Sequence, residues 1–307
     1  VLDTNAIPYA ALKGASLSLE FYDEPALRPM RDLDIMVLPG DAERAYEKLK
    51  AAGFEKLQGK GNYGLEYKHH LPPLRNAQGV ILELHHRIAP CDWSGSQPLG
   101  NQLVENARDV DFQGHTIRMA HPTDTYIHLV VHAAFHNLFD NGPNLLSDVV
   151  ALESTGLIDR GDVETFARSH GLVQSIALVE ALVAHFRGSE DVGVPEKMIE
   201  QAADLMTQNP EEHWQRFLLR KRRNPVGRIL GGVGRAFRPN AFDLSEIAGK
   251  DVSGLAALRH YPAWLYERAK VYLGAELKSG LDSEAAGDVE LEAWLERPEL
   301  TQRDAKA

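Results

Sequence analysis

The first 120 residues alternate short apolar stretches with turn-forming residues. Short runs of aliphatic residues that end at Gly or Pro predict strands, whereas apolar positions spaced three or four apart predict helices. Strands are expected over residues 9–13, 32–38, 64–71 and 80–88, with a hairpin around residues 113–114. Helices are expected over residues 15–22 and 42–52. This region therefore predicts a mixed sheet with flanking helices.

From about residue 121 the pattern becomes helical, and no strand signal of comparable strength returns. Helices are expected over residues 123–139, 144–154, 159–170, 172–186, 195–208 and 211–222. We predict an α+β chain with a mixed-sheet domain over 1–120, an all-helical domain over 121–280 and an acidic, mobile tail over 281–307. The alternative for the tail is a last short helix docked through its apolar residues Leu291, Trp294 and Leu295.

Composition and charge limit the classes of function. The net charge of -11 argues against a general nucleic-acid binder, which must neutralise phosphates. No apolar run approaches the ~20 residues that span a bilayer, and no signal-peptide pattern occurs at the start. A single cysteine, Cys91, excludes an intrachain disulfide and suits a reducing compartment. We expect a cytoplasmic protein without a transmembrane segment.

A basic segment over residues 216–238 stands apart from this acidic background. It carries Lys and Arg but no acidic residue. We interpret it as a solvated linker because several glycines weaken a helix there. The alternative is an amphipathic helix for a membrane surface or a partner.

Paired aspartates in the 32–38 stretch are the strongest chemical signal. Alternation along a strand places Asp32 and Asp34 on one face and the apolar residues between them on the other. Two close carboxylates repel each other, and a divalent cation relieves this repulsion. Glu83 is a third carboxylate among the aliphatic residues of the 80–88 strand, where an unpaired charge is costly. If the two strands are adjacent, the three carboxylates can hold Mg²⁺.

The residues before this strand suit a phosphate. Gly14 lets the backbone turn into a helix whose first N–H groups can face an anion. Lys13, Arg28 and Arg31 can offset the charge of a triphosphate. Together with the carboxylates they indicate phosphoryl or nucleotidyl transfer. The structural alternatives are that the arginines pair with the aspartates, that Lys13 is a surface cation, and that Glu83 pairs with a neighbouring basic residue.

Histidines recur in the helical half and in two adjacent pairs. His128, His132 and His136 are four residues apart and line one face of a helix. They invite a zinc interpretation, but no clear carboxylate or cysteine completes the site. We therefore expect His132 and His136 at the domain interface, bonded to Asp148 or facing the cleft. The adjacent pairs 69–70 and 85–86 diverge in a strand, so neither pair chelates a metal by itself.

Four motifs in this order resemble a bacterial family of uncharacterised nucleotidyltransferases within the DNA polymerase beta-like superfamily. The motifs are Leu12-Lys-Gly-Ala15, Arg28-x-x-Arg-Asp-Leu-Asp-Ile35, Glu83-Leu-His-His-Arg87 and His132-Ala-x-x-His136 followed by Asp148. They cover about residues 9–150. The superfamily usually has its Gly-Ser or Gly-Gly turn close before the aspartates, whereas residues 15–31 separate Gly14 from Asp32 here.

The resemblance implies a nucleotidyltransferase core and a role for each motif. Asp32, Asp34 and Glu83 would be catalytic and would bind Mg²⁺ or Mn²⁺. The expected nucleotide-binding residues are Lys13, Gly14, Ser16, Arg28 and Arg31, and the expected cleft or interface residues are His85, His132, His136 and Asp148. The donor would be an NTP, with ATP expected, and the acceptor a small molecule, a protein or an RNA.

Two other functions remain open from the sequence. A nucleotide-binding or toxin–antitoxin-type interaction protein could keep the fold without turnover, and displacement of Glu83 from the aspartates would favour it. A metal-dependent phosphohydrolase would need His132, His136 and Asp148 to converge.

Overall fold

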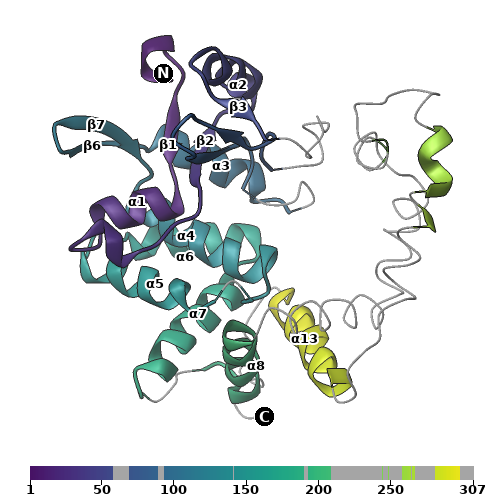
Figure 1. Cartoon of the computed structure of the whole chain (residues 1–307). Helices are drawn as coiled ribbons and strands as arrows, with labels where there is room; N and C mark the ends of the chain where they lie inside the picture. Colours follow the sequence, from purple (N-terminus) through teal and green to yellow (C-terminus); the bar gives the residue numbers. More distant parts are fainter. Residues whose placement is uncertain are drawn as a thin grey trace.

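A mixed seven-stranded sheet forms the N-terminal half of this computed structural model (Figure 1). The structure describes residues 1–57, 69–88, 93–140, 142–189, 193–208 and 281–297, and the short pieces 244, 248, 258–263 and 265–266; for residues 136 and 281–285 it describes the backbone alone. The strands are β1 (Tyr9–Ala11), β2 (Leu33–Val37), β3 (Glu55–Lys56), β4 (Leu74–Arg75), β5 (Ile81–His85), β6 (Arg108–Phe112) and β7 (His115–Met119). Their order across the sheet is β3-β4-β5-β2-β1-β7-β6.

Helices flank the sheet and then make up the rest of the described chain (Figure 1). They are α1 (Lys13–Glu20), α2 (Ala42–Ala51), α3 (Ser96–Glu105), α4 (Pro122–Val131), α5 (Asn144–Ser154), α6 (Arg160–His170), α7 (Val173–Phe186), α8 (Glu196–Thr207) and α13 (Leu281–Leu295). A π-helical turn over His132–His136 follows α4, and short 3₁₀ turns cover Asp3–Asn5, Pro25–Leu27 and Pro39–Asp41. The predicted α+β class, with a mixed sheet and a helical region after it, is confirmed.

Two hydrophobic cores lie on opposite faces of the central strands. On one face, Val37 of β2 and Leu84 of β5 pack with the apolar side of α2. On the other face, Met36 packs with Leu99 and Leu103 of α3. This second core continues without a break into α4, α5, α7 and α8. The sheet and the helical region thus share one core across residue 120, and their division into separate domains stays a prediction.

The pairing of β2 with β5 fixes the centre of the sheet. The two strands run parallel, with Asp34 opposite Glu83 and Ile35 opposite Leu84. Strand β1 pairs antiparallel with β2 on its other side. Because one face of β2 and β5 is buried against α2, a slip by one residue would expose Leu82 and Leu84 and is strongly disfavoured.

Helix α3 and strand β4 were not predicted. Gly95, Pro98 and Gly100 break the helical pattern, yet Pro98 lies in the first turn, where its missing N–H costs no helical hydrogen bond. Gly100 lies close to the core, since an added Cβ would come within 2.5 Å of the Met36 Cε atom and the methionine side chain would have to shift. Strand β4 lies in the stretch predicted as a turn, so the hairpin with β5 turns around Asn76. The predicted strand 64–71 is described only from residue 69, and the predicted helix 211–222 and the basic segment 216–238 lie outside the described residues.

The acidic C-terminal segment differs from the mobile tail that we expected. Residues Leu281–Leu295 form α13, which contacts α7 and α8. Leu291, Trp294 and Leu295 are buried in the shared core, as the alternative of a docked helix requires. Within the described residues, no helix combines the length and hydropathy needed to cross a membrane.

We predict that Trp294→Ala destabilises the fold by about 3–5 kcal/mol, because its indole is only 3% exposed in the shared core. The matched control is Glu296→Ala, on an exposed side chain of the same segment, with an expected change below ~0.5 kcal/mol. Urea unfolding of both variants measures the difference. Equal stability of the two variants would contradict the docking of α13.

Candidate active site

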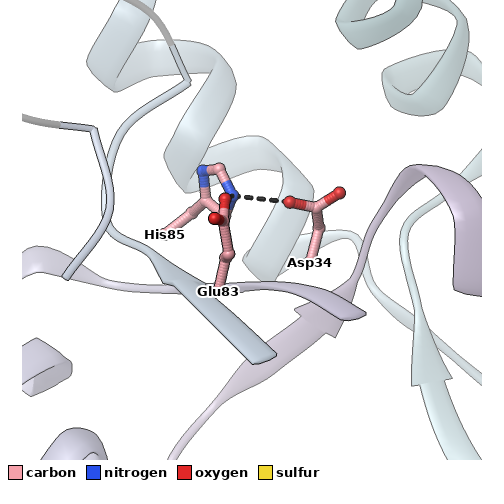
Figure 2. A group of neighbouring side chains, drawn as sticks. All are labelled: Asp34, Glu83 and His85. Atoms are coloured by element: carbon pink, nitrogen blue, oxygen red, sulfur yellow. Dashed lines mark hydrogen bonds and ion pairs between the residues drawn. The ribbon is translucent and has the colours of Figure 1, made fainter. Parts of the chain in front are cut away.

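Asp34 and Glu83 face the same side of the sheet from neighbouring parallel strands (Figure 2). Their positions follow from strand alternation, since the residues next to each of them along its strand pack in the core on the opposite face of the sheet. Asp34 is 7% exposed, whereas Glu83 is half-buried. The carboxylate cluster predicted from the sequence is therefore brought together at these two positions.

His85 completes this group. It lies two residues after Glu83 in β5 and therefore on the same face. Its Nε2 donates a hydrogen bond to Asp34 Oδ1 at 2.7 Å and lies 3.9 Å from Glu83 Oε2. One ligand atom from each of Asp34, Glu83 and His85 lies within 4.8 Å of the others, a spacing that can hold a metal ion.

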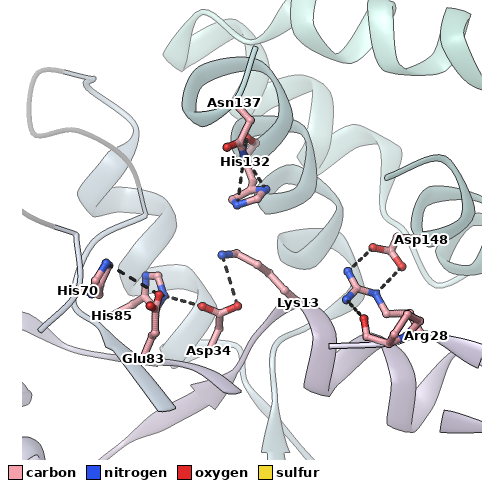
Figure 3. A network of polar contacts seen from close by, with 10 residues as sticks. Lys13, Arg28, Asp34, His70, Glu83, His85, His132, Asn137 and Asp148 are labelled. Carbon is pink, nitrogen blue, oxygen red and sulfur yellow. Dashed lines mark hydrogen bonds and ion pairs between the residues drawn. The ribbon is translucent and has the colours of Figure 1, made fainter. Parts of the chain in front are cut away.

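Positive groups keep Asp34 ionised. Burial would raise the pKa of Asp34, but the hydrogen bond from His85 and the charge of Lys13 hold that pKa well below its ordinary value. Lys13 Nζ lies 3.4 Å from Asp34 Oδ2 (Figure 3). Lys13 also has a φ of 36°, a left-handed conformation that costs a non-glycine residue about 1–3 kcal/mol. The Lys13 side chain is largely buried and paired with Asp34, so it is not a free surface charge.

Asp32 lies just before β2, half-buried at the edge of the same group. Burial raises its pKa, and the negative charges of Asp34 and Glu83 raise it further. The negative charges of the three carboxylates thus repel one another. Any cation bound among them would stabilise the ionised form of all three.

An open cleft of about 820 Å³ lies over these residues, within the usual size range of small-molecule sites. One side is formed by the carboxylates and His85, and another by the loop over residues 28–31. The remaining wall comes from the π-helical turn and the segment after it. The lining residues are Lys13, Gly14, Arg28, Pro29, Met30, Arg31, Asp32, Asp34, His69, Glu83, His85, His132, Phe135, Asn137, Asp140 and Asn144.

Arg28 forms an ion pair with Asp148 rather than with the aspartates near the start of β2 (Figure 3). Its Nε and Nη2 donate to the two oxygens of Asp148 at 3.0 and 2.8 Å. Tyr22 Oη donates to the same carboxylate at 2.7 Å, and burial raises the pKa of Tyr22 to about 12. This network ties the loop before β2 to α5. Asp148, which we expected to bond His132 and His136, is bonded by Arg28 and Tyr22.

Gly14 and Ser16 differ in their relation to the cleft. Gly14 lines it, and a Cβ there would lie 2.9 Å from Met30 Cβ and 3.2 Å from Arg28 Nη1. Its lack of a side chain lets the 28–30 loop pack against α1. Ser16 is fully buried and does not line the cleft, and its Oγ has no hydrogen-bond partner among the described residues. Arg31 is exposed and lines the cleft.

The π-helical turn shapes the wall that faces the carboxylates. His132 begins this turn, and Asn137 Nδ2 donates to the His132 carbonyl at 2.9 Å (Figure 3). Leu138 and Phe139 then have positive φ values of 43° and 63°. π-Helical turns and such backbone strain occur often at functional sites. The side chain of His136, the other predicted histidine, lies outside the described residues.

Several cleft residues were missed from the sequence. His69, Asn137, Asp140 and Asn144 line the cleft but belong to no motif that we recognised, and Phe135 lies at an unspecified position of the motif over residues 132–136. His70 was dismissed as part of an adjacent pair, although it forms a β-bridge with His85. The predicted pairing of strands 64–71 and 80–88 could have placed His70 beside His85.

The ion pair between Arg28 and Asp148 is expected to stabilise the fold. Asp148→Ala leaves a largely buried guanidinium unpaired and should cost about 3–5 kcal/mol in urea unfolding. Glu164→Ala removes the exposed partner of Arg168 and should cost at most ~1 kcal/mol. If both variants lose the same small amount, Arg28 is not fixed by Asp148.

The buried His128 is expected to make the free energy of unfolding depend on pH. Burial lowers the pKa of His128 well below 6.5, and the charges of Lys13, His132 and His85 lower it further. The unfolded chain therefore takes up this proton first, so stability is lost as the pH falls below 6.5. The slope from this one group is at most ~1.4 kcal/mol per pH unit.

His128→Leu should flatten this slope between about pH 6.5 and 5, measured as the free energy of unfolding at each pH. His115→Leu, at an exposed position on β7, is the control and should keep the wild-type slope. A His128→Leu slope as steep as that of the control would show that His128 is not held neutral.

The chain is similar to known proteins over its first 188 residues. The model of the family described as uncharacterised nucleotidyltransferase matches residues 1–188. No curated protein matches the chain. Among solved structures, the chain is similar to the lincosamide antibiotic adenylyltransferase LnuA in its lincomycin-bound form, at 14% identity and a TM-score of 0.34. That match covers 50% of this chain and 90% of the other.

The match to the family model spans the sheet, the candidate site and the helices up to α7. The motifs that resemble this family all lie inside it. The chain therefore belongs to the uncharacterised nucleotidyltransferase family and is a transferase.

Proposed function

We propose that this chain transfers a nucleoside monophosphate from an NTP to an acceptor by a metal-dependent reaction at Asp32, Asp34 and Glu83. The observation that carries the proposal is the register of β2 and β5, which puts Asp34 beside Glu83 on the face of the cleft. A nucleotidyl transfer needs concentrated negative charge that can hold divalent cations against a triphosphate.

The residues present fit Mg²⁺ or Mn²⁺. Carboxylate oxygens are the preferred ligands of both ions. The raised pKa of Asp32, caused by burial and by its acidic neighbours, reflects a cluster short of positive charge. Bound there, such an ion would offset the charge of the triphosphate and polarise its phosphorus–oxygen bonds.

The reaction that we propose is a displacement at the α-phosphorus of the NTP. An acceptor oxygen forms the new bond to phosphorus while the bond to the bridging oxygen of the β-phosphate breaks. Pyrophosphate leaves with the electron pair, and the acceptor loses its proton to a carboxylate or to solvent. Glu83 is proposed to orient the acceptor and to assist this proton loss, while Asp34 stays ionised through His85 and Lys13.

The basic residues divide into two roles. Lys13 and Arg31 line the cleft and are proposed to contact phosphates. Arg28 is proposed to be a positioning residue, because its charged head is held by Asp148, which also accepts a hydrogen bond from Tyr22. It fixes the loop that leads to Arg31 and Asp32.

The substrates are proposed at the level of class. ATP is the donor that we propose to test first. The acceptor would meet a polar wall that includes His132, Asn137, Asp140 and Asn144, which suits a hydroxyl- or amine-bearing molecule. A small molecule fits the cleft volume, and a protein or RNA would present only its reactive end. The single cysteine suits a reducing cytoplasm as the site of this reaction.

The two other functions have less support. A binding protein without turnover would be favoured by a displaced Glu83, yet Glu83 lies directly opposite Asp34. A phosphohydrolase would need Asp148 as a ligand, but Arg28 and Tyr22 already bind both of its oxygens.

We predict that Asp34→Asn lowers nucleotidyl transfer at least ~100-fold, a loss typical of removing one preorganised charge from a transition state. The assay follows label from α-labelled ATP into acceptors in a cell extract, with Mg²⁺ or Mn²⁺ present. Asp109→Asn, an exposed carboxylate on β6, is the matched control and should keep wild-type activity.

Calorimetry with Mg-ATP separates binding from chemistry. Wild type should bind the complex, and the double variant Asp32→Asn/Asp34→Asn should bind it much more weakly. Identical binding by the two proteins, or a labelled product from the double variant, would overturn this site assignment.

A further inference from the structure

We propose that His70 and His85 supply nitrogen ligands to an ion held by Asp34 and Glu83, so that this position selects a divalent transition metal ion over Mg²⁺. This inference rests on the proposed function, since it concerns the same carboxylates. It goes further by assigning histidine ligands and a metal class to one part of the site.

Backbone pairing gathers the four side chains from three neighbouring segments. Asp34 of β2 is opposite Glu83 of β5 in parallel register. His70 forms an antiparallel bridge with His85 on the other side of β5. Residues directly opposite each other in a sheet point to the same face, so all four side chains lie on the face of Asp34. The rings of His70 and His85 have centroids 5.4 Å apart.

His70 is held in the tautomer of a metal ligand. Its Nδ1 lies 2.7 Å from the Leu71 carbonyl oxygen, which can only accept a hydrogen bond, so Nδ1 must donate. In the neutral ring, Nε2 then carries the lone pair, and it lies 3.9 Å from Glu83 Oε2 (Figure 3). A histidine that gives one ring N–H to a backbone carbonyl and turns the other nitrogen to a carboxylate has the arrangement usual around bound metals.

His85 provides the second nitrogen. Its Nε2 lies 2.7 Å from Asp34 Oδ1 and 3.9 Å from Glu83 Oε2, so it faces both carboxylates (Figure 2). Its Nδ1 is buried with no hydrogen-bond partner among the described residues. A bound ion would replace the hydrogen bond from Nε2 to Asp34, and the ring proton would then lie on Nδ1, where no described acceptor holds it.

The donor set decides the metal class. Imidazole nitrogens suit ions such as Zn²⁺, Fe²⁺ and Ni²⁺, whereas Mg²⁺ prefers oxygen ligands alone. Mn²⁺ prefers carboxylate oxygens but precedes these ions in the same transition series, and it serves here as the paramagnetic probe. Asp34, Glu83 and His85 form the close group, and His70 joins it only through Glu83, so we propose that His70 moves toward the ion on binding. An ion between Asp32 and Asp34 would have oxygen ligands from these two residues. The site thus offers one mixed nitrogen–oxygen position beside one oxygen position suited to Mg²⁺ with the NTP.

The test titrates the full, metal-free chain separately with Mn²⁺ and Mg²⁺ by calorimetry. We expect wild type to bind Mn²⁺ more tightly than Mg²⁺. His70→Ala should lower the Mn²⁺ affinity about tenfold or more, with a much smaller change for Mg²⁺. His115→Ala, at an exposed histidine of β7, should leave both affinities unchanged.

Pulsed electron paramagnetic resonance of bound Mn²⁺ gives a readout independent of activity. Coupling to imidazole ¹⁴N should appear in wild type, weaken in His70→Gln and His85→Gln, and vanish in the double variant. Glutamine keeps a polar group at each position, and thermal unfolding checks that each variant is folded.

The outcomes separate this inference from the proposed function. Bound Mn²⁺ without ¹⁴N coupling, together with an unchanged preference between Mn²⁺ and Mg²⁺ in His70→Ala, would overturn the nitrogen ligands, and label transfer would still support the transferase. Clear ¹⁴N coupling in a chain that transfers no nucleotide would support the ligands and contradict the proposed function.

Discussion

The parallel pairing of β2 with β5 is the constraint on which the candidate site depends. It sets Asp34 directly beside Glu83, two like charges that a sheet would not place together without compensation. The compensation comes from His85 and Lys13, which contact the two oxygens of Asp34. The register itself is held from below, where Val37, Leu82 and Leu84 pack against α2. Hydrophobic packing on one face thus positions the charges on the other.

The helical region acts on the same site through two connections. Its core is continuous with the core beneath α3, and its α5 supplies Asp148 for the Arg28 network. That network holds the loop between α1 and β2, which is longer than the turn usual in the superfamily. The buried carboxylate of Asp148 therefore fixes this longer loop to the helical region. The strained backbone after His132 forms the facing wall.

Local patterns in the sequence predicted much of this arrangement. Alternation correctly separated Asp34 from the apolar face of β2 and Glu83 from that of β5, and the family motifs pointed to the right strands. The contacts that the sequence did not predict join residues that are far apart along the chain. The partner of Arg28 lies 120 residues away, and the bridge between His70 and His85 needs a pairing that alternation within one strand cannot reveal. Helix α3 was not predicted because Pro98 and Gly100 lower the helix propensity of its sequence. Ser16 was assigned to the phosphate turn by motif, yet it points into the protein.

The central claim is that Asp34 and Glu83 share a divalent ion in the presence of a nucleotide. Anomalous diffraction at the manganese edge, from crystals grown with Mn²⁺ and an ATP analogue that cannot be cleaved between the α- and β-phosphates, tests it most directly. The account predicts an anomalous peak within bonding distance of both carboxylates, with the α-phosphate facing it. A peak bound elsewhere, or a nucleotide whose α-phosphate lies away from Asp34 and Glu83, would contradict the account.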